Sequence, residues 1–204
     1  MRENAKLIII PNLFGLGRAF FPQYFEWNCH NSRNGWIAND RNGMFPHGDK
    51  YINELIDKGK TIDEIYKLLN DKSFISREEV IDNFQFYTNK IKDRDLKCDV
   101  KIYDFIMNHY KREQLFYDQG HPTNMVIKEM VRQIRCILKI DDCSYDAEEM
   151  NIHEEFVYPC VRDALDLSWN QSTIRNRNCG KKVNKMDFYE YIKEYVWWQQ
   201  ISSV

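Results

Sequence analysis

Asp118 and His121 are the residues whose types and spacing most directly suggest chemistry. They lie in the segment Asp118-Gln-Gly-His-Pro122, where an aromatic run ends and Gly120 allows a turn. A nearby carboxylate can orient an imidazole and fix its tautomer, as a general base requires. The same spacing also suits a structural role, in which His121 caps a helix and Asp118 binds backbone amides. The residues alone leave both interpretations open.

The element that must position this pair is an amphipathic helix that follows it. Between Met125 and Leu138, apolar residues recur at helical spacing with charged residues between them. Pro122 suits the first helical position, because the N–H that it lacks would have no partner there. The pair would then lie at a helix N-terminus, whose partial positive charge disfavours an imidazolium and attracts anions. We therefore predict a neutral His121 beside an anion-binding helix end.

The rest of the chain indicates a helix-rich α/β protein. Residues 6–12 form a β-branched run without polar alternation, which is typical of a strand buried in a parallel sheet. Thr61 and Ser76 each begin a capping-box sequence and so predict two further helices. Residues 168–185 are polar and basic, and their pattern predicts a loop. We predict a single domain over residues 1–204 with a small, mostly parallel sheet.

Composition limits the function classes. The chain is 43% hydrophobic and 29% charged, as in soluble globular proteins, and its net charge of −2 argues against a nucleic-acid binder. The longest apolar run, Leu7–Ile10, is too short to cross a membrane. The six cysteines show no C-x-x-C pair, and no set of residues has metal-ligand spacing, so we predict no metal site. We expect free thiols in a cytoplasmic protein. Peripheral contact with the inner membrane and homo-oligomer formation stay open.

The other histidines are weaker candidates for chemistry. His30 follows Cys29, but adjacent residues on an extended loop point to opposite sides, which disfavours a Cys/His nucleophile. His47 lies beside a predicted helix start, where it either contacts a ligand phosphate or caps the helix. We expect His109 to be structural and His153 to be solvated.

Basic residues near the pair are candidates for phosphate binding. Lys111 and Arg112 shortly precede Asp118, and a basic loop contains Arg175 and Arg177. Such cationic groups neutralise phosphates well. For the loop arginines, a solvated basic loop is the simpler interpretation.

The order of these segments resembles the WcbI-type capsular polysaccharide biosynthesis family, whose members are named as acetyltransferases. The resemblance rests on Leu7–Leu13, Phe20–Pro22, Gly43–Asp49, Leu115–Asn124 and Tyr158-Pro159. The Asp-x-x-His-Pro pattern is also similar to the motif that carries the acid and base of the triad in SGNH (GDSL-like) hydrolases. The resemblance implies an SGNH-like three-layer arrangement.

The resemblance further implies coenzyme A binding and transfer of an acyl group, acetyl above all, to a sugar hydroxyl of capsular or surface polysaccharide. His121 would be the base and Asp118 its orienting partner. The groups expected to bind the phosphates are Lys111, Arg112, Thr123, Arg175 and Arg177. Such proteins are expected to contain an earlier strand ending in a Gly-Asn-Cys-type turn. Because nothing before Leu7 can form it, we expect the C-terminal portion of such a unit: either the chain is truncated at its N-terminus, or the protein has lost half of its site.

Two alternatives remain. An SGNH-like esterase or deacetylase would use the same Asp118–His121 pair together with a Ser or Cys nucleophile, which the sequence does not locate. A non-catalytic carbohydrate-binding remnant would instead depend on the aromatic side chains of residues 20–36. Trp27 and Trp36 in that segment could stack on sugar faces.

Overall fold

Helices dominate the architecture. The computed structural model describes residues 5–25, 45, 48–141, 154–177 and 183–201. The elements in chain order are η1 (Leu16–Ala19), β1 (Tyr24–Phe25), β2 (Gly48–Asp49), α2 (Lys50–Asp57), α3 (Ile62–Leu69), α4 (Arg77–Asp95), α5 (Tyr103–His109), α6 (Asn124–Leu138), α7 (Pro159–Ala164), β3 (Ile174–Arg177), β4 (Val183–Met186) and α8 (Phe188–Ile201).

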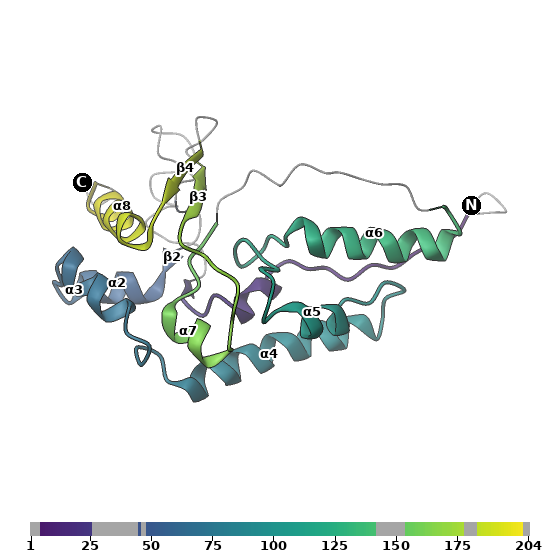
Figure 1. Cartoon of the computed structure of the whole chain (residues 1–204), viewed down its shortest axis with the longest axis horizontal. Coiled ribbons are helices and arrows are strands. Elements are labelled where there is room, and N and C mark those ends of the chain that lie inside the picture. The colour runs from purple at the N-terminus through teal and green to yellow at the C-terminus, as the bar shows by residue number, and fades with distance from the viewer. Residues whose placement is uncertain (1–4, 26–44, 46–47, 142–153, 178–182, 202–204) are drawn as a thin grey trace.

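The long helix α4 runs along one side of the molecule and organises its neighbours (Figure 1). It contacts η1, α5 and α7, and α5 in turn contacts α6. At the other end of the molecule, α8 packs on α2 and α3 and contacts β4. The part of the chain that carries the Asp118–His121 pair lies between α5 and α6, so these helices and α4 fix its surroundings.

Side-chain caps explain where two of the helices begin. The predicted capping box at α3 is confirmed, because the Thr61 side chain accepts from the Glu64 N–H and the Glu64 side chain accepts from the Thr61 N–H. At α4, the Ser76 hydroxyl accepts from the Glu79 N–H, which is the first half of the predicted box. The Glu79 carboxylate instead accepts from the Tyr51 hydroxyl, 3.3 Å away.

The prediction of a mostly parallel sheet is wrong. The described residues form two separate two-stranded ladders, and both are antiparallel. In the first, Tyr24 pairs with Asp49; in the second, Ile174 pairs with Met186. The second ladder lies in the segment predicted to be a loop. The sequence shows no clear apolar–polar alternation there, because polar and basic residues occupy both faces of these short strands. The described elements do not show the expected SGNH-like layering.

Residues 6–12 do not form the predicted buried strand. The exposed fractions of Leu7, Ile9 and Ile10 are 82%, 47% and 50%. The segment is extended and is held at Ile9, whose N–H donates to the Asp99 carboxylate at 2.7 Å and whose carbonyl accepts from the Asp99 N–H at 2.8 Å. A β-branched run favours extended backbone, but it does not by itself provide neighbouring strands.

An aromatic cluster ties the site to the helical scaffold. The Phe20 ring stacks on Phe116 with centroids 5.9 Å apart and meets the Phe84 ring of α4 edge-on at 5.6 Å. Phe20 and Phe116 are each almost fully buried, with exposed fractions of 4% and 2%. Because Phe116 lies two residues before Asp118, this cluster holds the catalytic candidate against η1 and α4.

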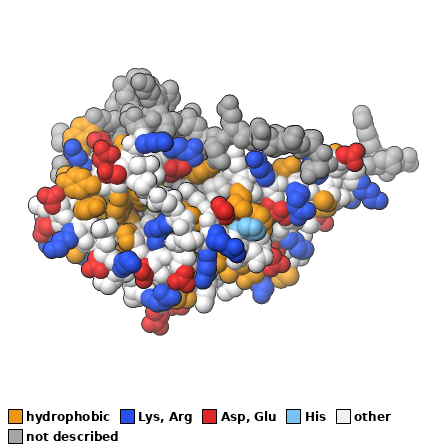
Figure 2. Space-filling view, viewed as in Figure 1, with side chains coloured by type: hydrophobic (Ala, Val, Ile, Leu, Met, Phe, Trp, Pro, Cys, Tyr) orange, Lys and Arg blue, Asp and Glu red, His pale blue; other side chains and the backbone are white. Residues whose placement is uncertain are grey.

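None of the described helices has the length and apolar character needed to cross a bilayer. Lys and Arg side chains are interspersed with Asp and Glu over the face shown in Figure 2. This mixed surface agrees with the small net charge of −2.

Candidate functional site

The candidate site is built on a tight loop between α5 and α6. The Tyr117 N–H donates to the His121 carbonyl at 2.9 Å, and the Thr123 N–H donates to the Leu115 carbonyl at 2.9 Å. Phe116 and Pro122 form an antiparallel bridge between these two bonds. The loop is therefore a closed hairpin with residues 118–120 at its tip.

The Asp118 carboxylate performs both roles that its spacing allowed. One oxygen, Oδ1, accepts from the N–H groups of Gly120 at 2.7 Å and His121 at 2.8 Å. The other, Oδ2, lies 2.7 Å from the Nδ1 of His121. Burial alone would raise the pKa of Asp118, but the His121 contact and the two backbone donors outweigh it and lower that pKa. The carboxylate is thus held ionised and in a fixed orientation.

His121 presents its other nitrogen away from Asp118. Its side chain is 49% exposed, whereas that of Asp118 is 2% exposed. Because Nδ1 is bonded to the carboxylate, Nε2 is the nitrogen left for a substrate, and within the described residues it has no hydrogen-bond partner. This is the tautomer that a general base requires, with the proton on Nδ1 and the lone pair on Nε2.

The pKa of His121 corrects the prediction made from the helix dipole. The hydrogen bond to Asp118 raises this pKa above its ordinary value of 6.5, and partial burial opposes the rise without cancelling it. Pro122 is also displaced from its predicted place, because α6 begins at Asn124 with Thr123 as its N-cap residue. The pair therefore precedes the helix end, and a short contact with a carboxylate outweighs a partial dipole charge.

The 3-10 helix η1 packs directly against the tip of the loop. A Cβ atom added at Gly17 would lie 2.2 Å from the Asp118 carbonyl oxygen and 2.9 Å from the Gln119 Cα. Only a glycine permits this approach of two backbones. The Gly15-Leu-Gly17 sequence, which is too incomplete for a dinucleotide fingerprint, thus has a local packing role, and Gly15 adopts a left-handed φ of 75°.

Arg18 of η1 also reaches the loop. Its Nε donates to the Gln119 Oε1 at 3.0 Å, and its guanidinium carbon lies 3.9 Å from the centroid of the Tyr24 ring. The Arg18 carbonyl accepts from the side-chain amide of Asn83 in α4 at 2.9 Å. No sequence signal predicts this placement, since Arg18 and Gln119 are 101 residues apart in the chain.

The segment before α7 also contacts the loop. The Glu155 N–H donates to the Tyr117 carbonyl at 2.9 Å. Glu155 is buried, and its Oε2 has no hydrogen-bond partner in the described part of the chain; the Tyr117 hydroxyl is in the same situation. Burial, reinforced by the charges of Asp118 and Asp49, raises the pKa of Glu155 well above its ordinary value of 4.5. The site therefore combines one ionised carboxylate with a second that favours its neutral form.

Replacing Glu155 with Gln should change how protein stability depends on pH. Because the folded state holds the Glu155 proton more tightly than the unfolded state, wild-type stability falls as pH rises from about 4.5 towards the raised pKa. Gln cannot ionise, so the melting temperature of the variant, relative to that of the wild type, should increase as pH rises over this range. Thermal unfolding from pH 4 to 8 measures the difference. Exposed Glu113→Gln is the control, and parallel curves for Glu155→Gln and wild type would contradict the assignment.

The residues predicted to bind phosphates are only partly brought together. Arg175 lies beside Tyr117, with its guanidinium carbon 4.9 Å from the ring centroid, and it is paired with Glu154 at 2.7 Å. Lys111 is exposed and lies 3.1 Å from an Asp166 carboxylate oxygen.

The remaining three candidates differ in accessibility. The Arg112 side chain is exposed. Thr123 is buried, and its hydroxyl has no hydrogen-bond partner among the described residues. Arg177 belongs to β3, but its side chain lies outside the described part of the structure.

Several other candidates lie outside the described residues. These are Trp27, His30, Trp36, His47 and His153, together with Cys29. His109 lies on α5, where its Nδ1 is 2.7 Å from the Phe105 carbonyl and its ring stacks on the Phe105 ring, in agreement with the predicted structural role. Among the described residues, no group of three His, Cys, Asp or Glu side chains could hold a metal ion.

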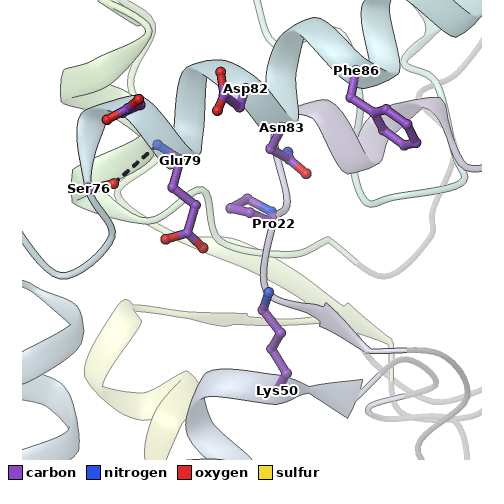
Figure 3. A pocket seen from close by; sticks show the side chains of 8 residues that line it. Pro22, Lys50, Ser76, Glu79, Asp82, Asn83 and Phe86 are labelled. Atoms are coloured by element: carbon purple, nitrogen blue, oxygen red, sulfur yellow. Dashed lines mark hydrogen bonds between the residues drawn. The ribbon is translucent and has the colours of Figure 1, made fainter.

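A separate hollow of about 490 Å³ lies between α4, Pro22 and Lys50 (Figure 3). Asp82, Asn83 and Phe86 line it from α4, while Lys50 extends towards it from the start of α2. Glu78 and Glu79 add to its negative charge. Such a lining disfavours phosphate groups, so the hollow is a poor candidate for a coenzyme A site.

Comparison with known proteins identifies the family. Residues 1–142, more than half of the chain, match the family model described as WcbI, a polysaccharide biosynthesis enzyme. No curated protein gives a significant match.

A solved structure shares the fold, with a TM-score of 0.67 and 16% sequence identity over 94% of this chain. It is described as WcbI, a novel polysaccharide biosynthesis enzyme, in the native form without a disulfide bond between coenzyme A and one of that protein's cysteines. The present chain spans 61% of the length of that chain. The family match, which includes the whole Asp118–His121 loop, shows that the chain belongs to the WcbI family of polysaccharide biosynthesis enzymes.

Proposed function

We propose that the chain is part of a coenzyme A-dependent O-acyltransferase, with acetyl as the group transferred to a sugar hydroxyl of a capsular or surface polysaccharide. The observation that carries the proposal is the geometry of His121. Its Nδ1 lies 2.7 Å from a buried carboxylate and its side chain is half exposed, so that Nε2 is accessible to a substrate.

The dyad can perform the proton transfers that this reaction needs. His121 Nε2 accepts the proton of the sugar hydroxyl while the oxygen attacks the thioester carbonyl carbon. The new C–O bond forms as the C–S bond breaks, and the coenzyme A thiolate takes the proton back from the imidazolium. The products are the O-acyl sugar and the free thiol. Asp118 stabilises the imidazolium between these two transfers and keeps the ring in place.

Coenzyme A as donor is supported by the solved WcbI structure, whose description mentions that molecule. The phosphate contacts assigned to Lys111, Arg112, Thr123, Arg175 and Arg177 stay predictions. Lys111 and Arg175 are already paired with carboxylates, with which a donor phosphate would compete. The exposed Arg112 has no ion-pair partner among the described residues.

Direct transfer needs no nucleophile from the protein, which distinguishes it from an SGNH-like hydrolysis. The described thiols are those of Cys98, Cys136 and Cys160, and burial raises the pKa of Cys160 and so disfavours its reactive thiolate. The likeness of Asp-x-x-His-Pro to SGNH motifs supports the acid–base role of the pair. The motif itself contains no nucleophile.

The proposal is tested by measuring acyl transfer from acetyl-CoA to oligosaccharide acceptors, together with release of free acetate. His121→Ala should lower kcat for transfer by about 10²–10⁴-fold, the usual contribution of a general base. His109→Ala, which removes a histidine from α5, should leave kcat unchanged. Acetate release without any acylated sugar would favour the hydrolase, and equal activity of His121→Ala and wild type would exclude this base.

The pH profile provides a second test of the same step. Only neutral His121 can accept a proton, and its pKa is raised above 6.5. We therefore expect kcat/KM to fall as pH decreases through a value above 6.5. An acid limb at or below pH 6 would show that another group is the base.

A further inference from the structure

Arg18 is a cation that the fold holds next to the catalytic candidate. The close approach of Gly17 to the Asp118 carbonyl fixes the backbone of η1 against the loop. The Arg18 side chain then turns onto the same loop, where its Nε donates to Gln119 Oε1 at 3.0 Å. The Tyr24 ring supports the flat face of the guanidinium at 3.9 Å. Two neighbouring residues of the loop that carries the Asp118–His121 pair, Asp118 and Gln119, are thus in contact with η1.

The charge of Arg18 is not neutralised by these contacts. Gln119 offers a neutral amide oxygen, and the Tyr24 ring is also uncharged. In the described part of the chain, no carboxylate lies within ion-pair distance of the guanidinium, and its terminal nitrogens Nη1 and Nη2 make no hydrogen bond. The side chain is half-buried, so its charge is less screened by water than that of a fully exposed arginine.

The orientation leaves one edge of the guanidinium available. Nε is used by Gln119 and one face is set against Tyr24, so the parallel N–H groups of Nη1 and Nη2 form the edge that no described residue occupies. This pair matches two oxygens of a phosphate, and its rotamer is fixed before the ligand arrives.

We propose that Arg18 is an anion-binding residue of this site and that it binds a phosphate group of a substrate through Nη1 and Nη2. The phosphate belongs either to the coenzyme A donor or to a phosphorylated sugar acceptor. The first assignment rests on the proposed function, whereas the second does not require coenzyme A.

Arg18 differs from the other cations near the loop. Arg175 is bonded to Glu154 through both its backbone and its side chain, and Lys111 is paired with Asp166. Binding a phosphate at either position would compete with an existing carboxylate. Among the described residues, no carboxylate is paired with Arg18, so a phosphate there would compete with none of them, which makes Arg18 the stronger anion site.

The experiment compares Arg18→Gln with wild type by calorimetric titration of coenzyme A, pantetheine and inorganic pyrophosphate. Pantetheine has the thiol arm of coenzyme A without its phosphates. Loss of one bidentate charged contact should weaken coenzyme A binding by about 10–100-fold and leave pantetheine binding unchanged. Arg77→Gln removes the same charge at an exposed position on α4, and it should bind all three ligands as wild type does.

The outcomes separate this inference from the proposed function. If wild type binds coenzyme A and pyrophosphate and Arg18→Gln binds both equally well, Arg18 is not the anion site, and the acyltransferase proposal is unaffected. If wild type binds pyrophosphate through Arg18 but does not bind coenzyme A, Arg18 is an anion-binding residue whose phosphate belongs to the acceptor. The proposal that coenzyme A is the donor would then be wrong. Equal weakening of coenzyme A and pantetheine would overturn the inference, because it would show that Arg18 only supports the loop through Gln119.

Discussion

Replacing Asp118 with Asn should lower kcat for acyl transfer by about 10²–10⁴-fold, the range expected for loss of a general base, while the loop keeps its shape. The amide oxygen of Asn can still accept from the N–H groups of Gly120 and His121, which Oδ1 accepts in the wild type. The amide nitrogen would then face His121 Nδ1 in place of Oδ2. Because this nitrogen is a donor, Nδ1 must become the acceptor and the imidazole proton moves to Nε2. The nitrogen that should take the substrate proton would already have one.

The same substitution should also change the titration of His121. Asp118 raises the pKa of His121 in the wild type, so its loss should move that pKa downward, and NMR titration of the imidazole measures the shift. Asp99→Asn is a matched control, since Asp99 also accepts a backbone N–H, from Ile9, far from the loop in sequence. A kcat near that of wild type for Asp118→Asn would show that the carboxylate serves only the turn.

Replacing Gly17 with Ala should impair activity and stability together. The added Cβ would lie 2.2 Å from the Asp118 carbonyl oxygen, and both partners belong to backbone that a rotamer change cannot relieve. Overpacking of this kind costs about 1–3 kcal/mol, equivalent to roughly 2–12 °C in melting temperature for a chain of this size. A shift of the loop by about 1 Å can also cost about 10²-fold in rate. We expect both effects, measured by thermal unfolding and by kcat/KM.

Gly59→Ala is the control for the general cost of losing a glycine. Gly59 has a left-handed φ of 70°, but a Cβ atom there would meet nothing within 4 Å. Its substitution should lower the melting temperature through backbone strain of about 1–2 kcal/mol and leave kcat/KM unchanged. If Gly17→Ala behaves in the same way, the contact between η1 and the loop does not position the dyad.

Local sequence signals were sufficient for the helices. The capping box at Thr61 and the apolar spacing between Met125 and Leu138 correctly indicate α3 and α6, because caps and amphipathic faces depend on residues within a few positions of one another. The run at residues 6–12 does not form the predicted buried strand, for the opposite reason. Its residue types favour extended backbone, but a sheet requires partners that lie elsewhere in the chain.

The sequence by itself determined that Asp118 and His121 share one short loop and that an amphipathic helix follows it. Their spacing allowed a turn or a dyad, and the tertiary structure shows that one carboxylate forms both through its two oxygens. Only the fold decided the surroundings of that loop. Gly17 and Arg18 reach it from about a hundred residues away in the chain, and Glu155 contacts it from the segment before α7. The pKa values of the pair depend on burial and contact distance, which are set by packing and cannot be read from residue order.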